Sequence, residues 1–170
     1  NPYLVDGSTS GILSHMEYLG YYGSRVNAEV IEKGQRAHVT YVVEPGDRYV
    51  IDSLSYVIRD TAMRRIFDRI SADSPVRSGA YLSQQALEDE SERIAGLLRN
   101  FGYFGFTKNY FFFSADTSAH DGTADLTVKV EDYTRNELPS AARPHVRYRF
   151  GDVNIVTAGR AKVKKAFIDD

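Results

Sequence analysis

Apolar residues recur at two different spacings along the chain, and together they predict a mixture of helices and strands. A helical stripe follows Asp60, which is a suitable N-cap: Met63, Ile66, Phe67 and Ile70. A second, longer helix is predicted to begin at Ser83, again as N-cap. Its apolar face consists of Leu87, Ile94, Leu97, Leu98 and Phe101.

Strand patterns surround these two helices. The alternation of residues 49–56 slips by one position at Asp52 and Ser53, which is typical of a β-bulge. Residues 107–113 and 124–131 are predicted to form two further strands, joined by a polar loop. The predicted order over residues 48–132 is therefore β-α-α-β-β.

A glycine followed by an aromatic residue ends each of two predicted helices. Gly102 stands where a left-handed residue closes a helix, and Tyr103 can then pack back on Leu98. Gly20 and Tyr21 stand in the same relation to the helix before them. We expect these four residues, Gly20, Tyr21, Gly102 and Tyr103, to be structural cap residues.

Three pairs of segments repeat in the same order along the chain. Residues 19–23 match 101–105, residues 37–44 match 124–131, and residues 48–57 match 147–156. Matches in a kept order indicate tandem copies of one unit. We predict the end of a first unit at 1–46, a complete unit at 47–133, a linker at 134–146 and the start of a third unit at 147–170.

The predicted fold class is α+β, with three strands and two helices on one face of the sheet in each unit. The residues leave the sheet order open. If the helices form an antiparallel hairpin, either the strand at 107–113 is central and all pairs are antiparallel, or the strand at 124–131 is central and the sheet is mixed.

Composition and charge narrow the function classes. The chain has 170 residues, 21 Lys and Arg, 23 Asp and Glu, and no Cys. A formal net charge of -2 gives no basic field for a nucleic-acid backbone, so no nucleic-acid partner is expected. The longest apolar run has four residues, at 110–113, whereas a spanning helix needs about 20.

No catalytic, cofactor-binding or metal-ligating set stands out. The four histidines, His15, His38, His120 and His145, lack metal-ligand spacing and are expected at the surface or on strand faces. Glu88, Asp89, Glu90 and Glu92 are expected on a solvated helix face, with Asp89 and Arg93 as an i,i+4 pair. An enzyme, such as a hydrolase, would need a nucleophile, base and orienting group that we do not find.

The repeated pattern, the helix ends at 19–22 and 101–104 and the joint at 44–46 resemble polypeptide-transport-associated (POTRA) domains. This family occurs in the periplasmic arm of outer-membrane barrel-assembly proteins of the BamA and TamA kind. The resemblance covers the second helix and hairpin of one unit (about 9–44), one complete unit and the first strand of another. It implies a mixed sheet in which the strand at 124–131 is central.

The resemblance also implies a function without cofactors. The expected place is the periplasmic face of the outer membrane of a diderm bacterium, with a C-terminal membrane β-barrel outside this chain. The expected partners are unfolded outer-membrane protein clients, companion subunits of an assembly complex and the protein's own barrel. The alternatives are the arm of a two-partner secretion transporter and a purely structural docking scaffold.

An aromatic run marks the candidate partner-binding edge. Its residues are Thr107, Asn109, Tyr110, Phe111, Phe112 and Phe113. In a half-buried strand, either Phe111 and Phe113 or Tyr110 and Phe112 would face away from the helices. An incoming strand could pair with this edge and lay its side chains along the exposed rings.

The two joints between predicted units differ in length. Pro45 and Gly46 leave almost no slack, so we expect a fixed angle there. The longer second joint, with Pro139 and Pro144, is expected to be looser.

Overall fold

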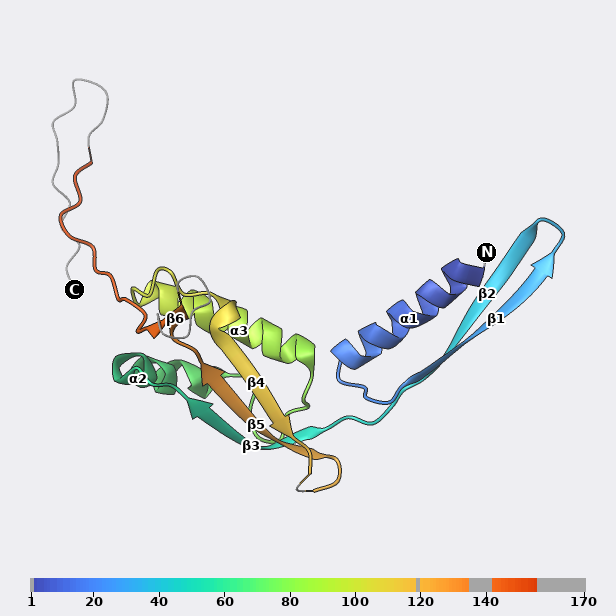
Figure 1. Ribbon diagram of the computed structural model, residues 1–170, viewed down its shortest axis with the longest axis horizontal. Helices are drawn as coiled ribbons and strands as arrows, with labels where there is room; N and C mark the ends of the chain where they lie inside the picture. The colour runs from blue at the N-terminus through green and yellow to red at the C-terminus, as the bar shows by residue number, and fades with distance from the viewer. Residues whose placement is uncertain (1, 119, 135–141, 156–170) are drawn as a thin grey trace.

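A computed structural model describes residues 2–118, 120–134 and 142–155 of the chain. Within them, an N-terminal helix and hairpin lie beside a larger α+β unit, and a C-terminal segment leaves that unit on the opposite side (Figure 1). The N-terminal part comprises α1 (Pro2–Tyr18), β1 (Arg25–Lys33) and β2 (Arg36–Glu44).

Helix α1 begins earlier than expected. The sequence pattern placed the helix from about residue 9, whereas the structure extends it from Pro2 through Gly7 and Gly11. The hydroxyls of Ser8 and Thr9 donate hydrogen bonds to the carbonyl oxygens four residues earlier, so these polar residues are accommodated within the helix instead of starting it.

The hairpin β1–β2 is antiparallel and only partly covered. The turn between the strands contains Gly34 with φ of 63°, in the left-handed region that glycine enters readily. Helix α1 contacts β1. Farther along the same face, the cross-strand partners Val30 and Val39 are 47% and 38% exposed, so the apolar face remains open toward the hairpin tip.

The larger unit follows the predicted β-α-α-β-β order. It contains β3 (Val50–Val57), α2 (Thr61–Ile70), the 3₁₀ turn η1 (Ser71–Asp73), α3 (Gln84–Asn100), the 3₁₀ turn η2 (Lys108–Tyr110), β4 (Phe111–Asp116) and β5 (Thr123–Val130). The strand order is β3-β5-β4, with β3 parallel and β4 antiparallel to β5. This resolves the alternative left open by the residues: β5 is central, and the sheet is mixed.

The core lies between the central strand and the two helices. Residues Ala124, Leu126, Val128 and Val130 alternate along β5 and are all buried. They face Phe67 on α2 and Leu98 on α3, each fully buried in the same cluster. A shift in the β3–β5 register between Ile51 and Leu54 confirms the predicted bulge.

The helix ends also follow the sequence. The Asp60 side chain accepts hydrogen bonds from the N–H groups of Ala62 and Met63, and the Ser83 hydroxyl accepts one from Ala86. At the other end of α3, the N–H of Tyr103 donates to the Leu98 carbonyl across Gly102, whose φ is 96°.

Two short strands lie at the start of the predicted linker and within it. They are β6 (Tyr133–Thr134) and β7 (Ala142–Arg143), paired antiparallel. Residues 135–141, including Pro139, lie outside the described part of the chain, and so do residues 156–170 of the expected third unit.

Candidate partner-binding site

Strand β4 forms one edge of the three-stranded sheet. Among the described residues, β5 is the only strand that pairs with it. The N–H of Glu131 donates to the carbonyl of Tyr110, and narrow and wide pairs alternate in an antiparallel ladder. The backbone groups of Phe112, Ser114 and Asp116 therefore bond toward β5, whereas those of Phe113 and Ala115 point to the outer edge.

The aromatic run divides between the two faces of the sheet. Phe111 is 8% exposed and contacts Phe106 and Phe67, and the half-buried ring of Phe113 stacks on Phe111 at 6.3 Å between centroids. Phe112 points to the opposite face and is 50% exposed. The sheet therefore turns Phe111 and Phe113 toward the helices and leaves Phe112 as the exposed ring of β4.

The expected start of this strand at Thr107 is wrong. Thr107 and Asn109 precede β4, and the segment that includes Asn109 and Tyr110 is the 3₁₀ turn η2. The N–H of Phe111 donates to the carbonyl of Lys108 within this turn, so these residues do not continue the edge. At its other end β4 continues to Asp116, beyond the predicted limit at Phe113.

Tyr110 is turned inward by contacts distant in sequence. Its ring lies 5.4 Å from Phe106 and 4.5 Å from the ring of His145. Burial raises the pKa of the Tyr110 hydroxyl, and the nearby Tyr133 raises it further. This residue therefore packs beneath the start of β4.

His145 is a structural residue that sequence reasoning missed. Its ring contacts Phe106 as well as Tyr110, and its Nε2 lies 2.8 Å from the carbonyl oxygen of Glu131. These contacts attach the end of the predicted linker to the larger unit. Nothing in the spacing of the histidines could have indicated this, because the contacts cross the fold.

The outer face of the sheet is polar near Asp116, whereas Phe112 and Val57 are exposed apolar residues at its other end. On the polar part, Ser53 donates to Asp125, and the hydroxyls of Ser55 and Thr127 are 3.0 Å apart. Asp116, at the end of β4, stands directly opposite Asp125. Hydrogen bonds from the Ser118 hydroxyl and N–H lower the pKa of the Asp116 carboxyl, so it is ionised at neutral pH.

Behind β4, a charged pair supports the helical layer. Glu90 is buried at 5% exposure, and both of its oxygens accept hydrogen bonds from Arg93. Arg93 also donates to the carbonyl of Ile70, at the end of α2. The bond to Glu90 is the main reason that the pKa of Arg93 is raised.

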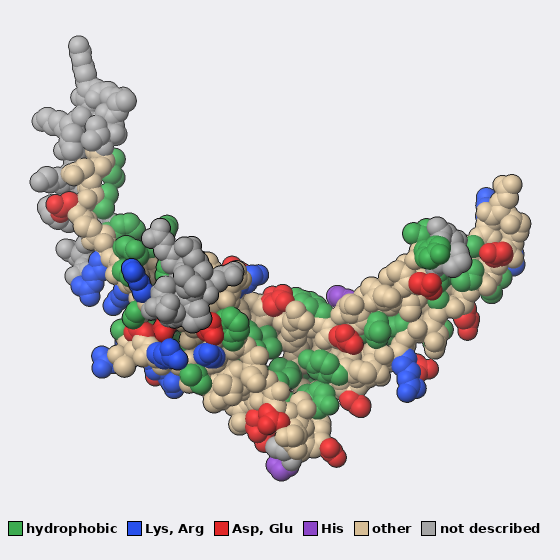
Figure 2. All heavy atoms as spheres, viewed as in Figure 1, with side chains coloured by type: hydrophobic (Ala, Val, Ile, Leu, Met, Phe, Trp, Pro, Cys, Tyr) green, Lys and Arg blue, Asp and Glu red, His purple; other side chains and the backbone are tan. Residues whose placement is uncertain are grey.

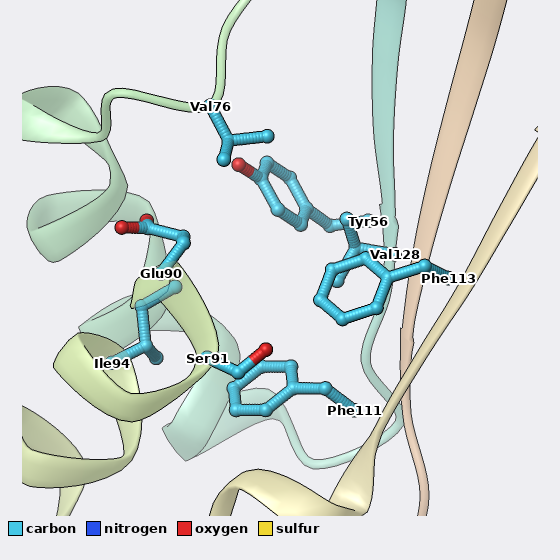
Figure 3. A pocket seen from close by; sticks show the side chains of 8 residues that line it. All are labelled: Tyr56, Val76, Glu90, Ser91, Ile94, Phe111, Phe113 and Val128. Atoms are coloured by element: carbon cyan, nitrogen blue, oxygen red, sulfur yellow. The ribbon is translucent and has the colours of Figure 1, made fainter. Parts of the chain in front are cut away.

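This arrangement corrects two expectations. Glu90 does not lie on a solvated face, and Arg93 pairs with Glu90 at i,i+3 instead of with Asp89. Figure 3 shows Glu90 on the α3 side of a hollow, with Tyr56 and Phe113 of the sheet across from it. Burial raises the pKa of Tyr56, and the neighbouring Glu90 adds to that shift.

The joint between the hairpin and the larger unit is closely built. Tyr22 forms an isolated bridge with Asp47, and the N–H of Gly46 donates to the Ser24 hydroxyl. The guanidinium carbon of Arg48 lies 4.9 Å from the Tyr21 ring centroid and 4.0 Å from that of Tyr81. One cation is thus shared between rings on the two sides of the joint.

The described part of the chain has neither a cluster of metal-ligand residues nor a helix that could cross a membrane. No group of three or more His, Cys, Asp or Glu residues in 2–118, 120–134 and 142–155 is placed to hold a metal ion. Over the same residues, no helix has the length and apolar character needed to cross a membrane. The space-filling view shows acidic, basic and apolar side chains interspersed on the visible face (Figure 2).

Comparison with known proteins gives similarities in structure alone. No family model matches the chain, and no curated protein matches its sequence. BamA from Haemophilus ducreyi lacking POTRA domains 1–3 is similar at 16% identity and a TM-score of 0.44, over 78% of this chain and 23% of that one. The POTRA3–5 part of Haemophilus influenzae BamA is similar at 12% identity and a TM-score of 0.45, over 85% and 63%.

The chain thus spans less than two thirds of the length of either solved structure. Its own topology agrees with the sequence-based expectation: β-α-α-β-β order, both helices on one face, and a mixed sheet with β5 in the centre. The larger α+β unit of this chain has a POTRA-like fold.

Proposed function

We propose that this chain is a non-enzymatic, protein-binding scaffold that holds extended segments of partner polypeptides along the free edge of β4. In the finer form of the proposal it works in the periplasm, in an arm of an outer-membrane assembly protein, and its partners are unfolded outer-membrane proteins. The observation that carries the proposal is the outward backbone of Phe113 and Ala115 beside the half-exposed ring of Phe112.

The opposite edge of the sheet is less suitable for strand addition. There the segment before α3 already bonds to β3: the N–H of Leu82 donates to Tyr49, and that of Ile51 donates to Ala80. An incoming strand would have to displace these bonds along the first half of β3. On β4, an added strand would form backbone hydrogen bonds without breaking any that the described residues make.

Main-chain pairing also suits partners of varied sequence. The backbone hydrogen bonds of an added strand depend little on its side chains, so one edge can bind many extended segments. The larger unit offers a stable platform for this edge, because the face of the sheet behind β4 is packed on Phe67, Phe106 and the helices.

A direct test is photocrosslinking from position 112 in the full-length protein in its native envelope. A photoreactive side chain at Phe112 should crosslink to unfolded outer-membrane proteins, whereas the same group at Asp89, exposed on α3, should not. Crosslinks only to a fixed companion protein would make the edge a docking site, and the client-binding role would have to be withdrawn.

A backbone variant tests the strand-pairing mechanism itself. Ala115→Pro removes an outward N–H at an exposed edge position, where proline is tolerated in sheets. We expect this variant to lose the crosslinks. Ala115→Val keeps the N–H and should retain them, so equal crosslinking by both variants would contradict β-augmentation.

A further inference from the structure

We propose that the β4 edge selects partner strands that carry a basic residue opposite Asp116 and an apolar residue opposite Phe112. This inference rests on the proposed function and specifies its partner. In an antiparallel partner the basic residue comes first and the apolar residue follows four positions later.

The spacing follows from the strand itself. Side chains alternate between the two faces, so Phe112, Ser114 and Asp116 share the outer face of β4. Successive residues rise by about 3.4 Å, which places the ring and the carboxylate about 13 to 14 Å apart. A partner strand has the same rise, so its first and fifth residues can face Asp116 and Phe112 together.

The charges around Asp116 favour a basic side chain at that end of the added strand. Asp116 and Asp125 stand directly opposite each other on neighbouring strands, and like charges in this position repel. The hydrogen bonds from Ser118 keep Asp116 ionised. In the described part of the chain, neither carboxylate takes part in a salt bridge. A lysine or arginine on an added strand would offset this repulsion.

The surroundings of Phe112, at the other end of β4, favour an apolar side chain on the added strand. Phe112 is half exposed, and its cross-strand partner Lys129 forms an ion pair with Glu131 at 2.9 Å. The positive charge beside the ring is therefore already paired. An apolar side chain at this position would cover the exposed ring, as cross-strand apolar and aromatic neighbours do in sheets.

The corresponding edge of the hairpin lacks this pattern. Strands β1 and β2 correspond to β4 and β5, with the pair Val26 and Val43 in the place of Phe111 and Val130. Asn27 of β1 then corresponds to Phe112, and Ile31 corresponds to Asp116. The polar and apolar positions are thus nearly reversed. The two edges should prefer different partners, and the pattern is a property of β4.

The test uses synthetic nine-residue peptides of β-forming polar residues with Lys at position 3 and Leu at position 7, added to the 170-residue chain. A second peptide has Glu in place of Lys, and a third exchanges the positions of Lys and Leu. Fluorescence anisotropy at low salt gives each dissociation constant. We expect the Lys peptide to bind about two- to fivefold more tightly than the Glu peptide, as for one exposed ion pair.

Variants assign the effect to its residue. Asp116→Asn keeps an oxygen that can accept the Ser118 hydrogen bonds, so it removes the charge while preserving the turn. It should abolish the preference for Lys over Glu, and Asp116→Lys should reverse it. The matched control Asp89→Asn removes an exposed charge on α3 and should leave the preference unchanged.

The outcomes separate this inference from the proposed function. If all peptides bind equally and Ala115→Pro still abolishes their binding, strand addition stands but the selectivity is wrong. If the peptide with Lys and Leu exchanged binds more tightly than the original, the predicted antiparallel direction of the added strand is wrong. If no peptide binds even at low salt, the proposed function and this inference both fail.

Discussion

Gly20 at the end of the first helix packs directly on the backbone carbonyl of Leu82, which lies in the segment before α3. The φ of Gly20 is 89°, and a Cβ at this position would overlap the Leu82 oxygen. The glycine therefore has two physical requirements at once: a left-handed backbone and close contact across the joint.

Gly20→Ala should destabilise the protein. Backbone strain at such a position costs about 1–3 kcal/mol, and the overlap with Leu82 should also disturb the joint. Thermal or denaturant unfolding measures this loss. Gly11→Ala is the matched control because nothing lies within 4 Å of its added Cβ within α1, so we expect a gain of roughly 0.5–1 kcal/mol there. Equal effects of the two variants would contradict this explanation.

Arg48→Ala should loosen the same joint. It removes a cation that lies over both Tyr21 and Tyr81, each contact being worth about 0.5–2 kcal/mol. Small-angle scattering should show a broader distribution of distances between the hairpin and the larger unit than in the wild type. Arg59→Ala, an exposed arginine near Asp132, serves as control and should leave the distribution unchanged. An unchanged distribution for Arg48→Ala would show that the other joint contacts suffice.

Glu90→Ala should destabilise the helical layer. It leaves Arg93 without the carboxylate that accepts its two hydrogen bonds, which costs about 1–3 kcal/mol. The double variant Glu90→Leu, Arg93→Met replaces the pair by apolar side chains and should recover most of this loss. Chemical denaturation distinguishes the cases, and a double variant less stable than Glu90→Ala would contradict the interpretation.

Alkaline pH should weaken the fold through Tyr56, which is partly buried against the core. Burial raises the pKa of Tyr56 above its ordinary value of 10.0, so the unfolded chain loses this proton before the folded one. The resulting stability is fully present below about pH 10 and is lost as pH rises through the higher folded pKa. Unfolding measured from neutral pH to pH 11 should show a smaller alkaline loss for Tyr56→Phe than for the wild type. Parallel curves would rule out a contribution from Tyr56.

Local features of the fold could be predicted because their causes are near in sequence. The caps at Asp60 and Ser83 need only a side-chain oxygen and the N–H groups two or three residues later. The helix end at Gly102 and Tyr103 also uses contacts within one turn. The alternation of β5 indicated its buried face, since the period of a strand is two residues.

The candidate site could be predicted only in part, because some of its contacts join residues that are distant in sequence. The aromatic run indicated a strand, and Phe111, Phe112 and Phe113 do lie in β4. Its start at Thr107 was wrong because Tyr110 is held by Phe106 and His145, which are brought together by the fold. The partner-binding role of these residues, the division into units and a looser second joint stay predictions.

The sequence by itself determined the order of helices and strands over residues 48–132, the caps at Asp60 and Ser83, the bulge in β3 and the repetition of the pattern. Only the tertiary structure decided that β5 is central, that Phe112 is the ring of β4 that faces outward, and that Glu90 is buried with Arg93. The first group depends on bonds between neighbours along the chain. The second depends on which distant segments pair and pack, and the local pattern allowed more than one such pairing.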